Sequence, residues 1–256
     1  MAIYQSTGLR DFLQQSGCMR RGFLNGELRL RSGSAPATAD AAETGTLLVT
    51  ITVSSGARTA ETKAAGSVTL TGGGAGSVDT LTVSGVEIMG SATAFDTTLI
   101  VTAANVVDKI NKWNPVGIWA VTDGAATPKI TLYAPLGAGV VTWAVASTCT
   151  TITKTDVAFG TEVTGIAPVS GLQYGLSATG AVAKTGVWSG EVAATGVAGY
   201  WRLCGSVVDA GGSSTTLVRL QGTCGTSGAD YNMGSTTLVL GATHTVDTWT
   251  LTEPAS

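Results

Sequence analysis

The residues that could do chemistry in this 256-residue chain are few and far apart. His244 is the single histidine, and a catalytic histidine needs a nucleophile or a carboxylate beside it. Asp247 lies three residues further along a predicted strand, so the alternation of side chains places it on the opposite face. The pattern therefore favours a polar strand residue facing solvent at position 244 over a general base.

The four cysteines are Cys18, Cys149, Cys204 and Cys224, and none has the Cys-x-x-Cys spacing of a zinc site. Cys204 and Cys224 lie on adjacent predicted strands, where the two side chains could face one another and form a disulfide. Free thiols are the default in a reducing cytosol. We therefore expect both to be reduced in freshly purified protein, and we expect no bound metal.

The remaining motifs predict no catalytic residue and no cofactor. The glycine-rich run at 72–76 lacks the lysine and the following helix of a phosphate-binding loop. Most of the 17 acidic residues sit in predicted turns, where a carboxylate usually caps its own backbone, although a carboxylate pair formed in space stays open. The six tryptophans are spread over every region, which favours core or subunit-interface positions over one sugar-stacking platform. We expect a protein that is not an enzyme.

Charged residues make up only 12% of the chain, and 35 glycines indicate many tight turns between short strands. The longest uncharged run, residues 130–153, contains proline and glycine and alternates Thr with Val, which predicts buried strands rather than a membrane segment. The N-terminus lacks the charged start and apolar run of a signal peptide, so we expect synthesis in a cytoplasm.

Residues 1–31 carry five arginines against Asp11 and Glu27, a local excess of +3 (5 − 2). Nucleic-acid binding would require a broader basic surface with aromatic residues, so we do not expect it. The pattern favours a basic arm that touches an acidic neighbouring subunit or solvent, and Arg20, Arg21 and Arg29 are its candidate interface residues.

Strand-like runs bounded by turn residues dominate both ends of the chain. They are residues 27–31, 46–53, 171–177, 187–193, 200–208, 215–223, 236–240 and 244–252. Connections this short predict hairpins and an antiparallel sheet. A short helix precedes them; Ser6 or Thr7 can cap it, and Gly17 would end it.

The pattern of predicted secondary structure changes at Ser54. Six predicted strands surround one long predicted helix at 97–113. Asp96 or Thr97 caps this helix, and its apolar residues recur at helical spacing: Ile100, Ala104, Val107 and Ile110. This α+β pattern predicts a small domain, residues 54–165, inserted into a discontinuous domain of residues 1–53 plus 166–256. Three tandem pieces are the alternative, but residues 1–53 hold too few strands to bury a core. We predict a mainly β fold, an antiparallel β-sandwich of jelly-roll or Ig-like type with an inserted α+β domain.

Several motifs carry a resemblance to a known family. They are GYWRL, SGADYNM and STTLVLGATHTVDTWTLTEP near the C-terminus, with GLRDFL and GELRLRSGSAPATADAAETGTLLVTI near the N-terminus. Together these stretches, roughly half of the chain, resemble a family of small structural proteins of tailed bacteriophages. The inserted segment is similar to small α+β modules in phage tail and neck proteins. The resemblance implies a virion component, and a 204–224 disulfide formed after lysis of the host stays open.

Two functions remain. The first is a virion accessory protein, a capsid decoration or cement protein or a neck or tail fitting, whose partners are further copies of itself and major capsid or tail proteins. The second is a receptor- or glycan-binding module of a tail or fibre. The absence of a fibrous repeat favours the first. The closing strands carry almost no Lys or Glu, so Thr237, Val239, Thr248 and Thr250 are further candidate interface residues.

Overall fold

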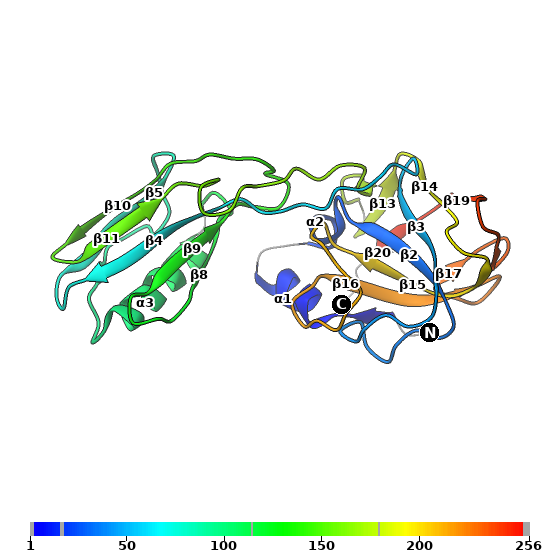
Figure 1. Ribbon diagram of the computed structural model, residues 1–256, viewed down its shortest axis with the longest axis horizontal. Helices are drawn as coiled ribbons and strands as arrows, with labels where there is room; N and C mark the ends of the chain where they lie inside the picture. The colour runs from blue at the N-terminus through cyan, green and yellow to red at the C-terminus, as the bar shows by residue number, and fades with distance from the viewer. Residues whose placement is uncertain (1–2, 16–17, 114, 179, 253–256) are drawn as a thin grey trace. The chain divides into compact units, whose positions relative to one another are not determined.

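The computed structural model describes residues 3–15, 18–113, 115–178 and 180–252, and it is mainly β, as the sequence predicts. The chain divides into two compact units (Figure 1). Unit 1 comprises Met1–Glu61 and Pro168–Ser256, and unit 2 comprises Thr62–Ala167. Unit 2 is thus an insertion in unit 1. It begins at Thr62 rather than at the predicted Ser54, and unit 1 resumes at Pro168 rather than at residue 166.

Unit 1 is built on a nine-stranded sheet with the order β1-β16-β15-β2-β3-β14-β19, to which β17 and β18 are added on β16 and β15. The strands are β1 (Tyr4–Gln5), β2 (Glu27–Ser32), β3 (Leu47–Val53), β14 (Trp188–Glu191), β15 (Gly196–Cys204), β16 (Arg219–Gly225), β17 (Tyr231–Asn232), β18 (Thr237–Leu238) and β19 (Thr243–Val246). The pairings are antiparallel, as predicted, with one correction. β17 runs parallel to β16, so these two strands are not joined as a hairpin.

A three-stranded sheet of β12 (Gln173–Tyr174), β13 (Ala181–Thr185) and β20 (Thr250–Thr252) completes the β structure of unit 1. The predicted strand 244–252 is therefore two strands. β19 pairs with β14 in the large sheet, and β20 pairs with β13. The break has a physical reason. Val246 and Trp249 are both buried, whereas unbroken alternation would point one of them into solvent.

Two helices precede β2 in the chain, α1 (Thr7–Gln15) and α2 (Met19–Phe23). Of the two predicted caps, Ser6 and Thr7, it is Ser6 that caps α1, because its hydroxyl accepts the backbone N–H of Leu9 at 3.0 Å. The predicted end of this helix at Gly17 lies outside the described residues. Leu9 and Phe23 are fully buried, and they join the core of unit 1 together with side chains of both sheets.

Unit 2 contains two four-stranded sheets and one described helix. The elements are β4 (Ala65–Gly72), β5 (Ser77–Val83), β6 (Val86–Glu87), β7 (Thr93–Ala94), α3 (Leu99–Trp113), β8 (Trp119–Thr122), β9 (Lys129–Tyr133), β10 (Val145–Thr150) and β11 (Thr153–Val157). One sheet has the order β10-β5-β6 with β7 added on β5, and the other has the order β11-β4-β9-β8. Both sheets and α3 share one core.

The helix α3 starts slightly later than predicted and turns a different face inward. Thr98 caps it, with its hydroxyl accepting the N–H of Val101 at 3.2 Å, instead of Asp96 or Thr97. The buried side chains are those of Thr102, Ala103, Val106 and Ile110. The predicted apolar face was partly wrong, because Ile100 and Ala104 are exposed. Thr102 can be buried because its hydroxyl donates to the Thr98 carbonyl at 2.9 Å.

The chain enters and leaves unit 2 through neighbouring backbone positions of unit 1. Thr59 and Val169 exchange two backbone hydrogen bonds of 3.1 Å, a geometry that places their Cα atoms about 5.5 Å apart. We expect that replacing residues 62–167 with a short Gly-Ser loop leaves a folded, mainly β protein. Circular dichroism and a cooperative thermal transition are the measurements.

A second deletion variant tests the boundary itself. Removal of residues 54–165 also deletes Arg58, which donates to the Glu27 carboxylate at 3.2 Å and to the Ser206 carbonyl at 2.6 Å. It also deletes Glu61, which is 2% exposed. This variant should melt well below the first one. Equal melting temperatures would show that the boundary at Glu61 is not the structural one.

Candidate functional site

The central strands β2, β15 and β16 have one apolar face and one polar, charged face. Leu28, Leu30, Trp201, Leu203 and Leu220 alternate into the core. The residues between them, Glu27, Arg29, Arg202, Arg219 and Gln221, point to the other face and are nevertheless buried. The strand register places Arg202 directly between Arg29 on β2 and Gln221 on β16. Both faces of this sheet are therefore covered.

The polar face, hereafter the arginine layer, is neutralised from within unit 1. Asp209 accepts two hydrogen bonds of 2.6 Å from Arg219, and both side chains are at most 3% exposed. Arg29 pairs with Glu27 and, at 3.1 Å, with Glu43. Burial alone would raise the pKa of Asp209, but the bonds from Arg219 hold that pKa below its ordinary value.

The connector between β2 and β3, residues 33–46, forms the lid over the arginine layer. Arg202 donates to the Ala41 carbonyl at 3.0 Å, and Gln221 donates to the Pro36 carbonyl at 2.7 Å. The Tyr200 hydroxyl donates to the Thr44 carbonyl at 2.8 Å. The described charged groups of this layer thus make their ion pairs and hydrogen bonds inside unit 1. The layer therefore has a structural role and is closed to a ligand.

The Arg219–Asp209 pair provides a stability test. Arg219→Met leaves a buried, unpaired carboxylate, so we expect a loss of about 3–5 kcal/mol in the free energy of unfolding. The double variant R219M/D209N removes both charges but keeps an oxygen for the Gly211 N–H, so it should recover much of that loss.

Urea unfolding measures both variants of the arginine layer. Lys112→Met is the control, because its ion pair with Asp108 lies on the exposed surface of α3 and should matter little. A double variant as unstable as R219M would show that the pairing of the two charges is not what stabilises this face.

The structure corrects the proposed basic arm. Arg29 is 8% exposed and bound within the arginine layer, so it cannot serve as a free interface residue. Arg20 lies on α2 and is half-buried, and its guanidinium donates to the carbonyls of Tyr174 and Gly175 at 3.3 and 2.8 Å. Arg21 is half-buried on the same helix. Internal acceptors thus hold Arg20 and Arg29 to unit 1, and Arg21 is part of helix α2.

The predicted Cys204–Cys224 contact is wrong, although the two strands are adjacent. Cys204 lies opposite Arg219, and Cys224 lies five residues further along β16, opposite Tyr231 of β17. Five strand residues span about 16 Å, far beyond the reach of a disulfide. All four cysteines are free. Burial raises the pKa of the Cys224 thiol to about 12, so this thiol is protonated at neutral pH.

Three of the six tryptophans, which sequence spacing left scattered, converge in the core of unit 1. The rings of Trp201 and Trp249 meet edge to face at 4.9 Å, and Trp188 lies 6.2 Å from Trp249. Tyr174 and Tyr231 extend the cluster. All three tryptophans are less than 9% exposed, so this cluster supports packing and offers no open sugar-stacking platform.

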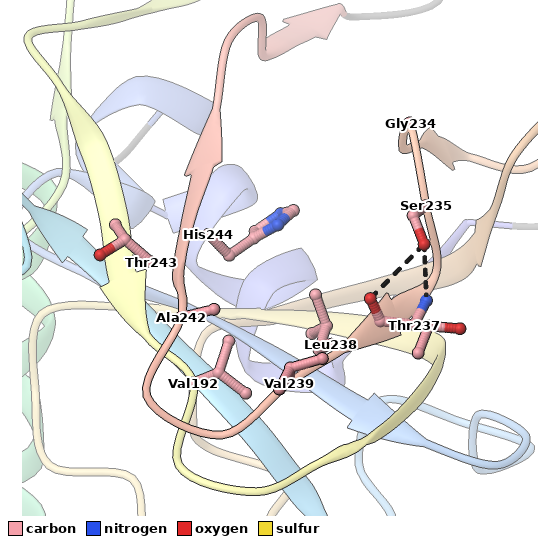
Figure 2. A pocket seen from close by; sticks show the side chains of 9 residues that line it. All are labelled: Val192, Gly234, Ser235, Thr237, Leu238, Val239, Ala242, Thr243 and His244. Atoms are coloured by element: carbon pink, nitrogen blue, oxygen red, sulfur yellow. Dashed lines mark hydrogen bonds between the residues drawn. The ribbon is translucent and has the colours of Figure 1, made fainter.

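A pocket of about 290 Å³ lies beside β19. Figure 2 shows residues 234–239 on one side and residues 242–244 on the other, with the His244 ring directed into the space between them. Its lining is neutral and mixes aliphatic and hydroxyl side chains: Val192, Gly234, Ser235, Thr237, Leu238, Val239, Ala242, Thr243 and His244. Two of the predicted interface residues, Thr237 and Val239, therefore line one pocket.

His244 is half-buried and does not simply face solvent as the sequence predicted. Its Nε2 lies 3.1 Å from the hydroxyl of Tyr231, a residue that the strand pattern did not single out. Burial lowers the pKa of His244, while the nearby charge of Asp247 opposes that change. Burial also raises the pKa of Tyr231 to about 12, so the hydroxyl keeps its proton. Among the described residues, the pair has no nucleophilic partner within hydrogen-bonding distance.

The lowered pKa predicts an acid sensitivity. The unfolded chain binds a proton at His244 more readily than the folded protein does, so stability falls as pH drops below the ordinary value of 6.5. His244→Gln should abolish this dependence while retaining a partner for the Tyr231 hydroxyl. Thermal melting between pH 7.5 and 5 compares the two proteins. If the melting temperatures of the two proteins change equally with pH over that range, His244 is not the source of the acid sensitivity.

The remaining candidate interface residues are on the surface. Thr237, Thr248 and Thr250 are exposed, and Val239 is 57% exposed. Leu240, which the sequence did not single out, is 63% exposed beside Val239. Their role as an interface stays a prediction.

No group of metal-binding side chains occurs in the part of the chain that the structure describes. None of the helices in the same residues has the length and apolar character that crossing a bilayer requires. Comparisons of the chain with protein-family models, with curated proteins and with solved structures find no match. Function therefore has to be inferred from the surfaces described above.

Proposed function

We propose that the protein is a structural component of a tailed-phage virion, an accessory protein of the capsid, neck or tail that assembles through symmetric protein–protein contacts. The resemblance of its terminal segments to phage structural proteins supports the virion. The surface around β18 and β19 supports assembly. The role requires no cofactor and no catalytic residue.

One observation carries the assembly part of the proposal. Residues 231–246 contain no charged side chain, yet this stretch includes the exposed Val239 and Leu240. Val197 on β15, where β18 pairs, is a further exposed aliphatic residue at 58%. An isolated exposed aliphatic residue means little, but several within a neutral segment are typical of a protein interface. We name this surface, residues 197 and 231–246, the neutral edge.

The distribution of charge in unit 1 also supports assembly through the neutral edge. The arginine layer takes up arginines and carboxylates inside unit 1, where they contribute nothing to solubility. Surface charges normally keep proteins apart. A neutral edge therefore suits a protein whose copies are held against partners.

The receptor- or glycan-binding alternative has weaker support. Sugar sites commonly use exposed Trp, Tyr or Phe rings, and none of the residues that line the pocket is one of these three. The tryptophans of unit 1 are occupied in its core. The hydroxyl groups of the pocket lining and the His244 ring would be its sugar-binding features.

The test of the proposed function is incorporation into particles. Wild-type protein is added to virions that lack it, and the bound fraction is measured after sedimentation. V239K/L240K should lower the bound fraction at least tenfold, because a buried interface core tolerates unpaired charge poorly. Val140→Lys is the matched control, since Val140 is 64% exposed in unit 2. A wild-type protein that never joins particles but binds host polysaccharide tightly would establish the receptor-binding alternative instead.

A further inference from the structure

β19 is the last strand of the nine-stranded sheet, and its backbone groups point alternately toward and away from β14. The Val192 N–H donates to the Ala242 carbonyl at 2.9 Å, so Ala242 faces β14. Two residues on, His244 is paired with Gly190 and faces β14 as well. Thr243 and Thr245 must then direct their N–H and C=O groups away from the sheet.

The other side of β14 confirms this alternation. The carbonyl of Val187 accepts the N–H of Ser54, and the N–H of Ala193 donates to the carbonyl of Leu48. Odd-numbered residues of β14 therefore face β3, and even-numbered ones face β19. In the described part of the chain, no hydrogen bond engages the backbone groups of Thr243 or Thr245.

This open edge lacks the protection seen elsewhere in the protein. At the edge strand β8 of unit 2, the Asn111 side chain accepts from the Ala120 N–H at 2.9 Å and donates to the Ala120 carbonyl at 3.0 Å. It occupies the groups that a further strand would use. At the opposite edge of the large sheet, β1 is only two residues long. β19 has neither a guard of this kind nor a Lys, Glu or Pro.

We propose that β19 binds β19 of a second copy of this chain, antiparallel and across a two-fold axis at His244. The inference rests on the proposed function, and it specifies the contact that the proposed assembly uses. In this register Thr243 of each copy lies opposite Thr245 of the other. The two pairs form four backbone hydrogen bonds and join two nine-stranded sheets into one continuous sheet.

The register follows from the backbone alone. Only outward-facing residues can exchange hydrogen bonds across the new edge, and only an axis at position 244 pairs both of them within β19. An axis at position 243 or 245 leaves one of the two without a partner inside the strand. No charged side chain lies on β19, so two identical edges meet without like-charge repulsion.

The neighbouring surface favours a second copy over an unrelated peptide. A strand pair alone buries less than the roughly 1,200–2,000 Å² of a stable interface. Val239 and Leu240 precede β19 on the neutral edge, and their exposed side chains can add apolar area in both copies at once. A two-fold contact uses each such residue twice.

Charge reversal tests the pairing. T243K/T245K places like charges directly opposite one another in the proposed register, as does T243E/T245E, so each should weaken self-association at least tenfold. An equimolar mixture of the two variants should restore the dimer as a heterodimer. T127K/V140K is the control, because both residues are exposed and lie in unit 2, outside the candidate interface residues. Sedimentation velocity measures association, and circular dichroism shows that each variant is folded.

A cross-link tests the register. In a C18S background, which removes the exposed cysteine, H244C should form an intermolecular disulfide, since the Cα atoms at the axis lie about 4.5 Å apart. T243C should not do so, because residue 243 of one copy lies opposite residue 245 of the other, two residues away from the second residue 243. A T243C and T245C mixture should cross-link.

The outcomes separate this inference from the proposed function. If wild-type protein joins particles, and the charge variants join particles and self-associate equally well, the β19 contact is overturned and the virion role stands. A wild-type protein that is monomeric at every concentration tested also overturns the β19 contact. In that case the particle-binding experiment decides the virion role by itself.

Discussion

The burial of charge on the second face of the central sheet is the constraint on which unit 1 depends. A buried guanidinium or carboxylate is tolerated only when each charge finds a partner, since desolvation otherwise costs several kcal/mol. Arg219 and Asp209 meet this requirement through two hydrogen bonds, and Arg29 meets it through Glu27 and Glu43. The partners come from distant parts of the chain, so the arginine layer can form only when those parts are correctly placed together.

The arginine layer also explains the course of the loops. The connector of residues 33–46 contains mostly small and polar residues and has little apolar surface to bury. Its carbonyl groups at Ala41 and Pro36 accept from Arg202 and Gln221, so hydrogen bonds hold it to the sheet. With one sheet face closed by the apolar core and the other by this lid, the remaining accessible feature of the large sheet is its edge.

The edges of this protein are treated unequally, and that contrast links structure to function. Asn111 occupies the backbone groups of an edge strand in unit 2, whereas β19 in unit 1 leaves two residues unpaired beside an uncharged, partly apolar surface. Unprotected edges are normally a hazard because they promote uncontrolled association. Retention of one such edge is consistent with a contact that has a defined partner, as the proposed role in a virion requires.

The sequence by itself determined the mainly β class, the insertion of an α+β segment and a helix cap at Ser6 or Thr7, because turn residues, strand alternation and capping are local properties. It did not determine which helical face of α3 is buried, since Ile100 and Thr102 both lie at permitted spacings. It also did not determine the register that separates Cys204 from Cys224 or the break before Trp249. Those features, and the pairing of Tyr231 with His244, depend on which segments meet across the fold, and only the tertiary structure decides that.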